Sequence, residues 1–236
     1  MNPCPLLENH AGIWLFSAEQ LNQDFAQGKR YASGLRNIVA MDWNPYQNQL
    51  YVVQHGRDSL HDLFPSLYTE KQSAELPAEQ FLALREGFVG SWPYAYWDHF
   101  KNVFVQSPEY GGDGEKTSDQ YTPPLYGFPA HYAPNDLLFY KGEQFPEKYR
   151  KGTFVAFHGS WNRLGFEQKG YHVQFLPMED GKPSGEAEIF ISGFAGDKEI
   201  TASSQARYRP MGLSMLNDGS LLIVDSKEGR IWKVTF

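Results

Sequence analysis

The chain has 236 residues, of which 41% are apolar and 16% aromatic, so it can form a substantial core and disorder is not expected. Its net charge of −7 disfavours a nucleic-acid surface, which would need a basic face. No segment approaches the roughly 20 apolar residues of a membrane span. The single cysteine, Cys4, excludes an internal disulfide and a cysteine zinc cluster. The first residues show no basic segment followed by an apolar run, so no signal peptide is predicted.

Short apolar segments separated by turn residues predict β-strands along nearly the whole chain. The expected strands are, in chain order, Gly12–Phe16, Val39–Asp42, Gln49–Gln54, Asn102–Val105, Asp136–Tyr140, Thr153–His158, Tyr171–Pro177, Glu188–Ile191, Leu213–Leu216, Ser220–Asp225 and Arg230–Thr235.

A helix is indicated only in Thr69–Arg85, where Thr69 is a candidate cap and Pro77–Phe81 fits a short helix that begins at proline. We interpret residues 59–90 as an insertion that crosses between strands, with this helical segment inside it.

A two-strand unit recurs along the sequence. Leu221–Asp225 and then Ile231–Val234 form one copy, and Phe154–His158 followed by Tyr171–Leu176 forms another. Short strands in a repeated unit predict a radial stack of sheets, an all-β fold of the β-propeller type. A β-sandwich would also explain many short strands, but it would not explain the repetition.

Two arginine-bearing turns lie about 170 residues apart, at Gly34–Asn37 and Arg207–Leu213. Each leads into a short apolar strand, a turn and a second apolar strand. Loops that carry cations and precede inner strands could converge on an anion. On the residues alone, ion pairs at the ends of the sheets are the more frequent role of such arginines.

Seven motifs occur in the same order as in sorbosone dehydrogenase-like proteins, which resemble the soluble glucose dehydrogenases that use pyrroloquinoline quinone (PQQ) and calcium. They are Gly34–Asn37, Gln54–Asp58, Trp92–Tyr94, Pro108–Gly112, Ala133–Asp136, Phe157–Arg163 and Tyr208–Leu213. The resemblance runs from about Gly12 to Phe236. The family fold is a six-bladed propeller, and this chain is similar to its C-terminal half to two-thirds. The resemblance therefore implies one partial propeller domain over residues 1–236, with about three to four blades.

The resemblance implies that Arg36 and Asn37 contact PQQ and that Arg207 and Arg209 form a second arginine pair on it. PQQ is a planar tricarboxylate, and the arginine fork meets a carboxylate with two parallel hydrogen bonds. Alternation along an extended segment would place Arg207 and Arg209 on one side. His158 lies near the position where soluble glucose dehydrogenases have a cofactor-binding lysine.

By the same resemblance, the backbone carbonyls of Gly56 and Arg57 help to hold calcium. Backbone oxygens suit this cation, and glycine allows it to approach closely. Phe128 aligns with a family segment beside the substrate and is the candidate substrate contact. The alternatives for these positions are a glycine turn with a surface arginine, and packing.

The catalytic residue is unknown at this stage, because the catalytic histidine of the family lies upstream of the region that this chain resembles. His131 and His158 are weak candidates, and His55 lies at a similar strand end. Structural hydrogen bonding is at least as frequent a role for each. Asn162 and Arg163 are candidates only because they lie close to His158 in the sequence.

Three functions follow from these expectations. The first is a sugar or aldose dehydrogenase of the sorbosone or glucose type, in which PQQ accepts a hydride with calcium assistance. The second is a binding propeller without redox activity, which a partial ring would favour. The third is a calcium-dependent propeller lactonase, in which the arginines have no evident role. A second chain that completes the propeller and a periplasmic or secreted location are further implications.

Overall fold

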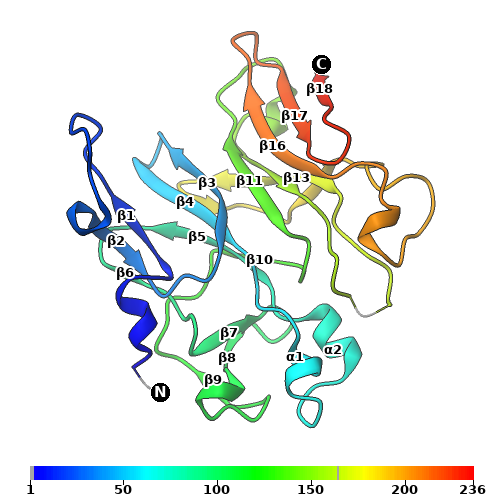
Figure 1. Ribbon diagram of the computed structural model, residues 1–236. Coiled ribbons are helices and arrows are strands. Elements are labelled where there is room, and N and C mark those ends of the chain that lie inside the picture. The colour runs from blue at the N-terminus through cyan, green and yellow to red at the C-terminus, as the bar shows by residue number, and fades with distance from the viewer. Residues whose placement is uncertain (1–2, 164) are drawn as a thin grey trace.

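The computed structural model describes residues 3–163 and 165–236, and nearly all of its regular structure is β-sheet (Figure 1). Two short α-helices interrupt the strands, α1 (Leu60–Leu63) and α2 (Glu70–Glu75). The described residues contain no helix that is long and apolar enough to cross a membrane. The all-β class predicted from the sequence is confirmed.

Three antiparallel sheets follow one another along the chain and form the part of the fold that carries the site. The first contains β3 (Ile38–Asn44), β4 (Gln49–Gln54), β5 (Glu79–Leu84) and β10 (Tyr126–Phe128). The second contains β11 (Pro134–Phe139), β12 (Gly152–Phe157), β13 (His172–Glu179), β14 (Lys182–Pro183) and β15 (Glu188–Ile191). The third contains β16 (Pro210–Met215), β17 (Leu221–Asp225) and β18 (Ile231–Val234). Their first strands are neighbours, because β3 packs on β11 and β11 packs on β16.

Two smaller sheets flank this stack (Figure 1). One contains β1 (Gly12–Leu15), β2 (Lys29–Ser33) and β6 (Phe88–Val89), in which β2 and β6 are parallel. The other contains β7 (Ala95–Asp98), β8 (Val103–Gln106) and β9 (Thr117–Ser118). In Figure 1 the β7–β9 sheet lies beside the two α-helices and below the main stack.

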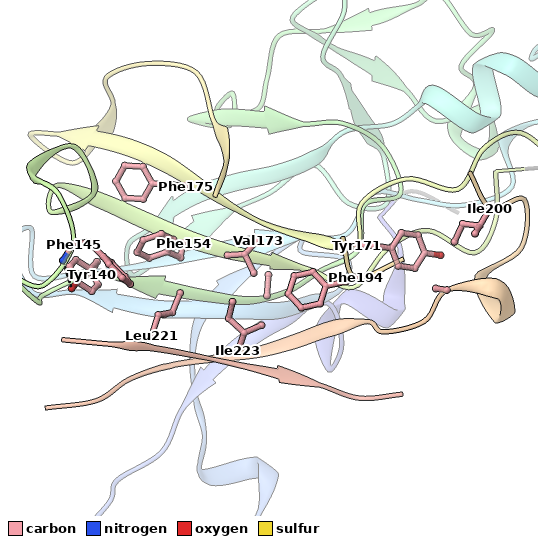
Figure 2. Packing of buried hydrophobic residues seen from close by; sticks show 12 residues of the cluster. Tyr140, Phe145, Phe154, Tyr171, Val173, Phe175, Phe194, Ile200, Leu221 and Ile223 are labelled. Carbon is pink, nitrogen blue, oxygen red and sulfur yellow. Dashed lines mark hydrogen bonds between the residues drawn. The ribbon is translucent and has the colours of Figure 1, made fainter. Parts of the chain in front are cut away.

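Strand β12 is buried on both faces, which explains its uninterrupted apolar sequence. Phe154 lies close to Leu221 and Ile223 of β17 (Figure 2), and Ala156 belongs to the same cluster. Val155 and Phe157 belong to the opposite cluster, which is shared with β4 and β5 of the first sheet. Each fully buried Phe contributes about 1.5–3 kcal/mol of hydrophobic stabilisation. Alternation along one strand therefore joins three sheets into one stack.

The first strand of each of the three sheets begins with a break in register. The shift falls between Ile38 and Ala40, between Pro134 and Asp136, and between Pro210 and Gly212. Such bulges change the direction of a strand and of the side chains around it. The same irregularity at three equivalent strand starts gives the repeat a structural basis.

The helix predicted in Thr69–Arg85 is only partly correct. Thr69 caps α2, because its Oγ1 accepts a hydrogen bond from the Gln72 backbone N–H at 3.2 Å. The expected helix at Pro77–Phe81 is wrong, because Glu79–Leu84 is β5, an inner strand between β10 and β4. Five of the six β5 side chains are buried, so contacts with both neighbouring clusters favour a strand there. The crossing insertion proposed for residues 59–90 thus contains a central strand of the first sheet.

Candidate functional site

A cavity of about 280 Å³ opens where the loops of the three stacked sheets meet. Six residues predicted for cofactor, metal or catalysis line it: Arg36, Asn37, Gly56, His131, His158 and Arg209.

The repeat explains why these residues meet. Arg36 and Arg209 directly precede the bulged first strands β3 and β16, whereas Gly56 and His158 follow the second strands β4 and β12. In an antiparallel pair, the start of one strand and the end of its partner lie at the same edge. Residues more than 150 positions apart therefore reach one cavity.

Arg36 is held on one wall of the cavity by its own neighbours. Its Nη1 donates to the carbonyl oxygen of Gly56 at 2.5 Å, and its Nη2 donates to Oδ2 of Asp58 at 2.9 Å. The guanidinium also lies 5.6 Å from the ring centroid of Trp92, which adds a cation–π contact. The positive charge of Arg36 is thus largely balanced by the Asp58 carboxylate.

Asp58 and His131 lie side by side next to Arg36. Oδ1 of Asp58 lies 3.5 Å from Nδ1 of His131, and the Asn162 side-chain amide donates to the same oxygen. Burial alone would lower the pKa of His131, but the Asp58 hydrogen bond and the nearby charge of Glu79 raise it. Burial likewise opposes ionisation of Asp58, yet the His131 hydrogen bond and the Arg36 charge lower its pKa. Both groups therefore tend toward their charged forms.

His131 is also fixed from behind. Its side chain is 3% exposed, and its Nε2–H donates to the carbonyl oxygens of Ser73 at 2.8 Å and Leu76 at 3.1 Å. These bonds orient Nδ1 toward Asp58 and the cavity. The segment between α2 and β5 thus positions this histidine.

Glu79 is a buried carboxylate at the start of β5 that sequence reasoning placed in a helix. It is 2% exposed, and its two oxygens accept the backbone N–H groups of Gly56 at 2.6 Å and Ala133 at 3.1 Å. Burial raises its pKa, against the opposing effects of His55 and His131. Glu79 therefore ties the loop after β4 to the loop before β11 and shapes the floor of the cavity.

Arg209 forms the opposite wall and is bound differently from Arg36. Its Nε donates to the carbonyl oxygen of His158 at 3.0 Å, and its Nη2 donates to that of Gly159 at 2.7 Å. Asp225 accepts the backbone N–H of Arg209 at 2.6 Å rather than its guanidinium. Among the residues described, the Arg209 guanidinium has no carboxylate within ion-pair distance.

His158 lies next to this uncompensated cation. Its Nε2 is 2.8 Å from Oγ of Ser226, and burial together with the Arg209 charge lowers its pKa to about 4. It is therefore a neutral imidazole near pH 7, and it cannot supply the positive charge of the lysine to which the resemblance relates it.

Two predicted contacts do not reach the cavity. Arg207 is exposed, and its guanidinium carbon lies 5.2 Å from the ring centroid of Tyr208. It does not line the cavity together with Arg209, as the expected alternation would require. Phe128 is 0% exposed and packs edge-on against Phe157 in the core. Since it is enclosed between two sheets, it cannot contact a substrate in this structure.

The side chains of Arg57 and Arg163 have structural roles. The Arg57 guanidinium forms two hydrogen bonds with Glu109, at 2.8 and 2.7 Å, and Arg163 bonds to the carbonyl oxygen of Ala74 and to Glu75. For the calcium site, the Gly56 carbonyl lies at the cavity but already accepts from Arg36. The described residues contain no group of three His, Cys, Asp or Glu suited to a metal ion.

The chain matches the TrAA12-like family over residues 7–236. It belongs to the TrAA12-like family. It is 29% identical over 212 residues to an uncharacterised protein of Borreliella burgdorferi, covering 87% of this chain and 48% of that protein. It is 26% identical over 249 residues to a PQQ-dependent pyranose dehydrogenase of Coprinopsis cinerea, covering 92% of this chain and 33% of that one. The chain thus spans about half or less of the length of these curated relatives.

Solved structures agree on the fold of this TrAA12-like chain. A Trichoderma reesei protein of carbohydrate-active enzyme family AA12 superimposes with a TM-score of 0.71 at 19% identity, over 96% of this chain and 59% of the other. The PQQ domain of the Coprinopsis cinerea pyranose dehydrogenase gives a TM-score of 0.65 at 19% identity, over 97% and 62%. The propeller-like fold is therefore confirmed, and so is the relationship to PQQ-dependent sugar dehydrogenases at the level of the family.

Proposed function

We propose that this TrAA12-like chain forms the cofactor-binding part of a sugar-oxidising quinoprotein, with PQQ in the cavity of about 280 Å³. One observation carries the proposal: two arginines from sheets at opposite ends of the stack, Arg36 and Arg209, converge on one cavity. A tricarboxylate needs cations from more than one direction, and arginine suits planar carboxylates.

The donor set of the cavity supports this ligand. Arg209 offers a cation without an ion-pair partner among the described residues, and Asn37 and Asn162 supply amides. Oδ1 of Asn162 is buried and has no hydrogen-bond partner in the described residues, so a polar ligand atom that donates would satisfy it. The volume is close to the lower end of the usual range for small-molecule sites, about 300–1,000 Å³.

When bound, PQQ would supply an electron-accepting quinone for oxidation of a sugar hemiacetal or aldehyde hydrate. The chain's own residues would hold its carboxylates through Arg36, Asn37 and Arg209. Asp58 and His131 would lie together at the cavity wall, where a substrate hydroxyl could exchange a proton with them. The sorbosone or glucose type of substrate is part of this proposal.

Calcium binding is also part of the proposal, under one condition. The Gly56 carbonyl would be its ligand, together with the Arg57 carbonyl of the same loop. Since Arg36 donates to the Gly56 oxygen, the guanidinium and the cation would compete for it. Calcium should therefore bind only if Arg36 is drawn toward another anion, which the quinone carboxylates would supply.

Calorimetric titration of the purified chain with PQQ, with and without calcium, tests the proposal. Arg209→Ala should weaken binding about tenfold or more, because hydrogen bonds to charged groups contribute about 1.5–3 kcal/mol. Arg207→Ala is the matched control, since that exposed side chain lies outside the cavity lining. Unchanged PQQ affinity in folded Arg209→Ala protein would contradict the assignment.

A non-catalytic propeller that packs on a second chain is a separate candidate, and one observation favours it. Val39, Met41 and Trp43 are 42–46% exposed on one face of β3, which is the terminal strand of the first sheet. A row of apolar side chains at the start of the stack suits contact with another protein surface. Sedimentation analysis tests this, since a monomer at high concentration would argue against a second chain. A periplasmic or secreted location is proposed from the resemblance alone.

The calcium-dependent lactonase has less support. It requires carboxylate and amide side chains that are free to bind a metal. Both oxygens of Glu79 accept backbone N–H groups, and both oxygens of Asp58 are bonded to other side chains. The arginine pair would also be without a role.

A further inference from the structure

A second cavity, of about 290 Å³, lies at one end of the β7–β9 sheet, outside the site described above. Tyr94 precedes β7, Gln106 ends β8, and β9 contributes Thr117 and Ser118. Seven residues line it in all: three tyrosines, two glutamines, one threonine and one serine. We call it the tyrosine pocket.

The lining of the tyrosine pocket restricts the class of ligand. None of the described lining residues is charged and none is aliphatic, so neither an ion nor a lipid chain matches it. Of the charged residues that adjoin the lining in sequence, Glu109 pairs with Arg57, whereas Lys116 and Asp119 carry opposite charges and do not line the pocket. Flat aromatic faces combined with amides and hydroxyls suit a neutral ligand that carries many hydroxyl groups.

The tyrosines are already held in place. Tyr94 and Tyr110 pack edge to face with centroids 4.7 Å apart, and the Cys4 backbone N–H donates to the Tyr94 hydroxyl at 2.7 Å. Tyr121 packs against Phe104 at 5.6 Å, and Gln120 donates to its hydroxyl at 2.9 Å. Burial and the contact with Cys4 raise the pKa of Tyr110 to about 12, so its hydroxyl stays neutral. A rigid aromatic surface loses little entropy when it binds a ligand.

Two side-chain contacts link the walls of the tyrosine pocket to those of the first cavity. Glu109, next to Tyr110, bonds to Arg57, and Arg57 follows Gly56 of the cavity. Trp92, two residues before Tyr94, lies against Arg36 of the cavity. The Arg57 side chain is buried in this connection, so the tyrosine pocket is a site of its own.

We propose that the tyrosine pocket binds one glycosyl unit of a neutral oligosaccharide, at a site separate from the main cavity. The proposal stands on the lining of the pocket and is independent of the proposed function.

The test is saturation-transfer NMR, followed by calorimetry, on the whole chain with four neutral pentasaccharides: cellopentaose, xylopentaose, maltopentaose and laminaripentaose. At least one should bind saturably, and glucose should bind more weakly. Tyr121→Ala should weaken the binding by about tenfold, the size expected when one aromatic contact is lost. Gln120→Ala is a second variant with an exposed side chain, which guards against a folding defect in the first.

Tyr46→Ala is the matched control, because Tyr46 is 70% exposed in the turn between β3 and β4. It should bind like the unaltered chain. The pocket assignment is overturned if no pentasaccharide binds the folded chain, or if Tyr121→Ala and Gln120→Ala both bind with unchanged affinity.

Arg209→Ala separates the two proposals. It should lose affinity for PQQ and retain affinity for the oligosaccharide. Oligosaccharide binding without any PQQ binding would refute the proposed function and leave the pocket standing, and the converse result would refute only the pocket.

Discussion

The two walls of the main cavity come from the same repeated unit, yet they carry opposite electrostatic arrangements. On the first wall, Arg36 faces the Asp58 carboxylate at 2.9 Å, and a buried Glu79 lies beneath. On the second wall, Arg209 donates to two carbonyl oxygens, and the nearby Asp225 carboxylate is used by backbone N–H groups instead. Carbonyl oxygens orient a guanidinium without cancelling its charge. We therefore propose that Arg209 is the main anion receptor and that the first wall serves the exchange of protons or cations.

The largest expected effect is a loss of folding stability when Glu79 of the first wall is removed. Glu79→Ala leaves the N–H groups of Gly56 and Ala133 without their acceptors in a buried position. Each unsatisfied buried group costs about 1–3 kcal/mol, so the loss of both acceptors should lower the free energy of unfolding by about 2–6 kcal/mol. Urea denaturation measures it.

Glu86→Ala is the control for this variant, because Glu86 pairs with Lys29 at the surface, with side chains 58% and 65% exposed. Its removal should cost no more than about 1 kcal/mol. If both glutamate variants have equal stability, Glu79 does not hold the two loops together.

The second prediction uses the two histidines, whose pKa values move in opposite directions. The pKa of His158 falls to about 4, so the unfolded chain, with an ordinary value near 6.5, takes up its proton first as pH drops. The His158 contribution is fully present above pH 6.5 and is lost as pH falls toward 4. The pKa of His131 is raised, so its contribution is fully present below pH 6.5 and is lost as pH rises through its folded value.

Urea denaturation at pH 7.5 and pH 5 distinguishes the two. Relative to the unaltered chain, His158→Gln should lose less stability on acidification, because no buried imidazole then needs to be held neutral beside Arg209. His131→Gln should show the opposite change, with its deficit larger at pH 5 than at pH 7.5. Parallel pH profiles for both variants would show that the two walls do not differ in charge balance.

Several features of the cavity could be predicted because they depend on local sequence. Strand ends, turns and the repeated unit placed Arg36, Gly56, His158 and Arg209 at equivalent edges, and the structure brings them together. Glu79 was not predicted as a site residue, because the proline before it suggested a helix. In addition, a strand that is buried on both faces shows no alternation of apolar and polar residues. A lone carboxylate just before the apolar segment Phe81–Leu84 was the available signal.

Other features depend on tertiary contacts that no local pattern contains. Phe128 lies in β10, whose pairing with β5 turns the ring into the core. Strand β7 was not predicted from the sequence. The residues of the tyrosine pocket come together only through the pairing of β7, β8 and β9. Sequence reasoning found the edges of the sheets better than the direction of individual side chains.

The last prediction concerns Arg207, and its expected effect on ligand binding is the smallest. Arg207 and Arg209 are equivalent on a simple alternating strand, but β16 begins only at Pro210, so alternation does not apply to them. Asp225 fixes the Arg209 backbone and directs its guanidinium to the His158 and Gly159 carbonyls, while Arg207 turns to Tyr208. Arg207→Ala should therefore leave PQQ affinity within about twofold of the unaltered chain, and its stability within about 0.5 kcal/mol, as is usual for surface substitutions. Calorimetry on both arginine variants measures the contrast. An equal loss of affinity in the two would mean that the second wall binds its anion through charge alone, without the orientation that the carbonyl contacts of Arg209 impose.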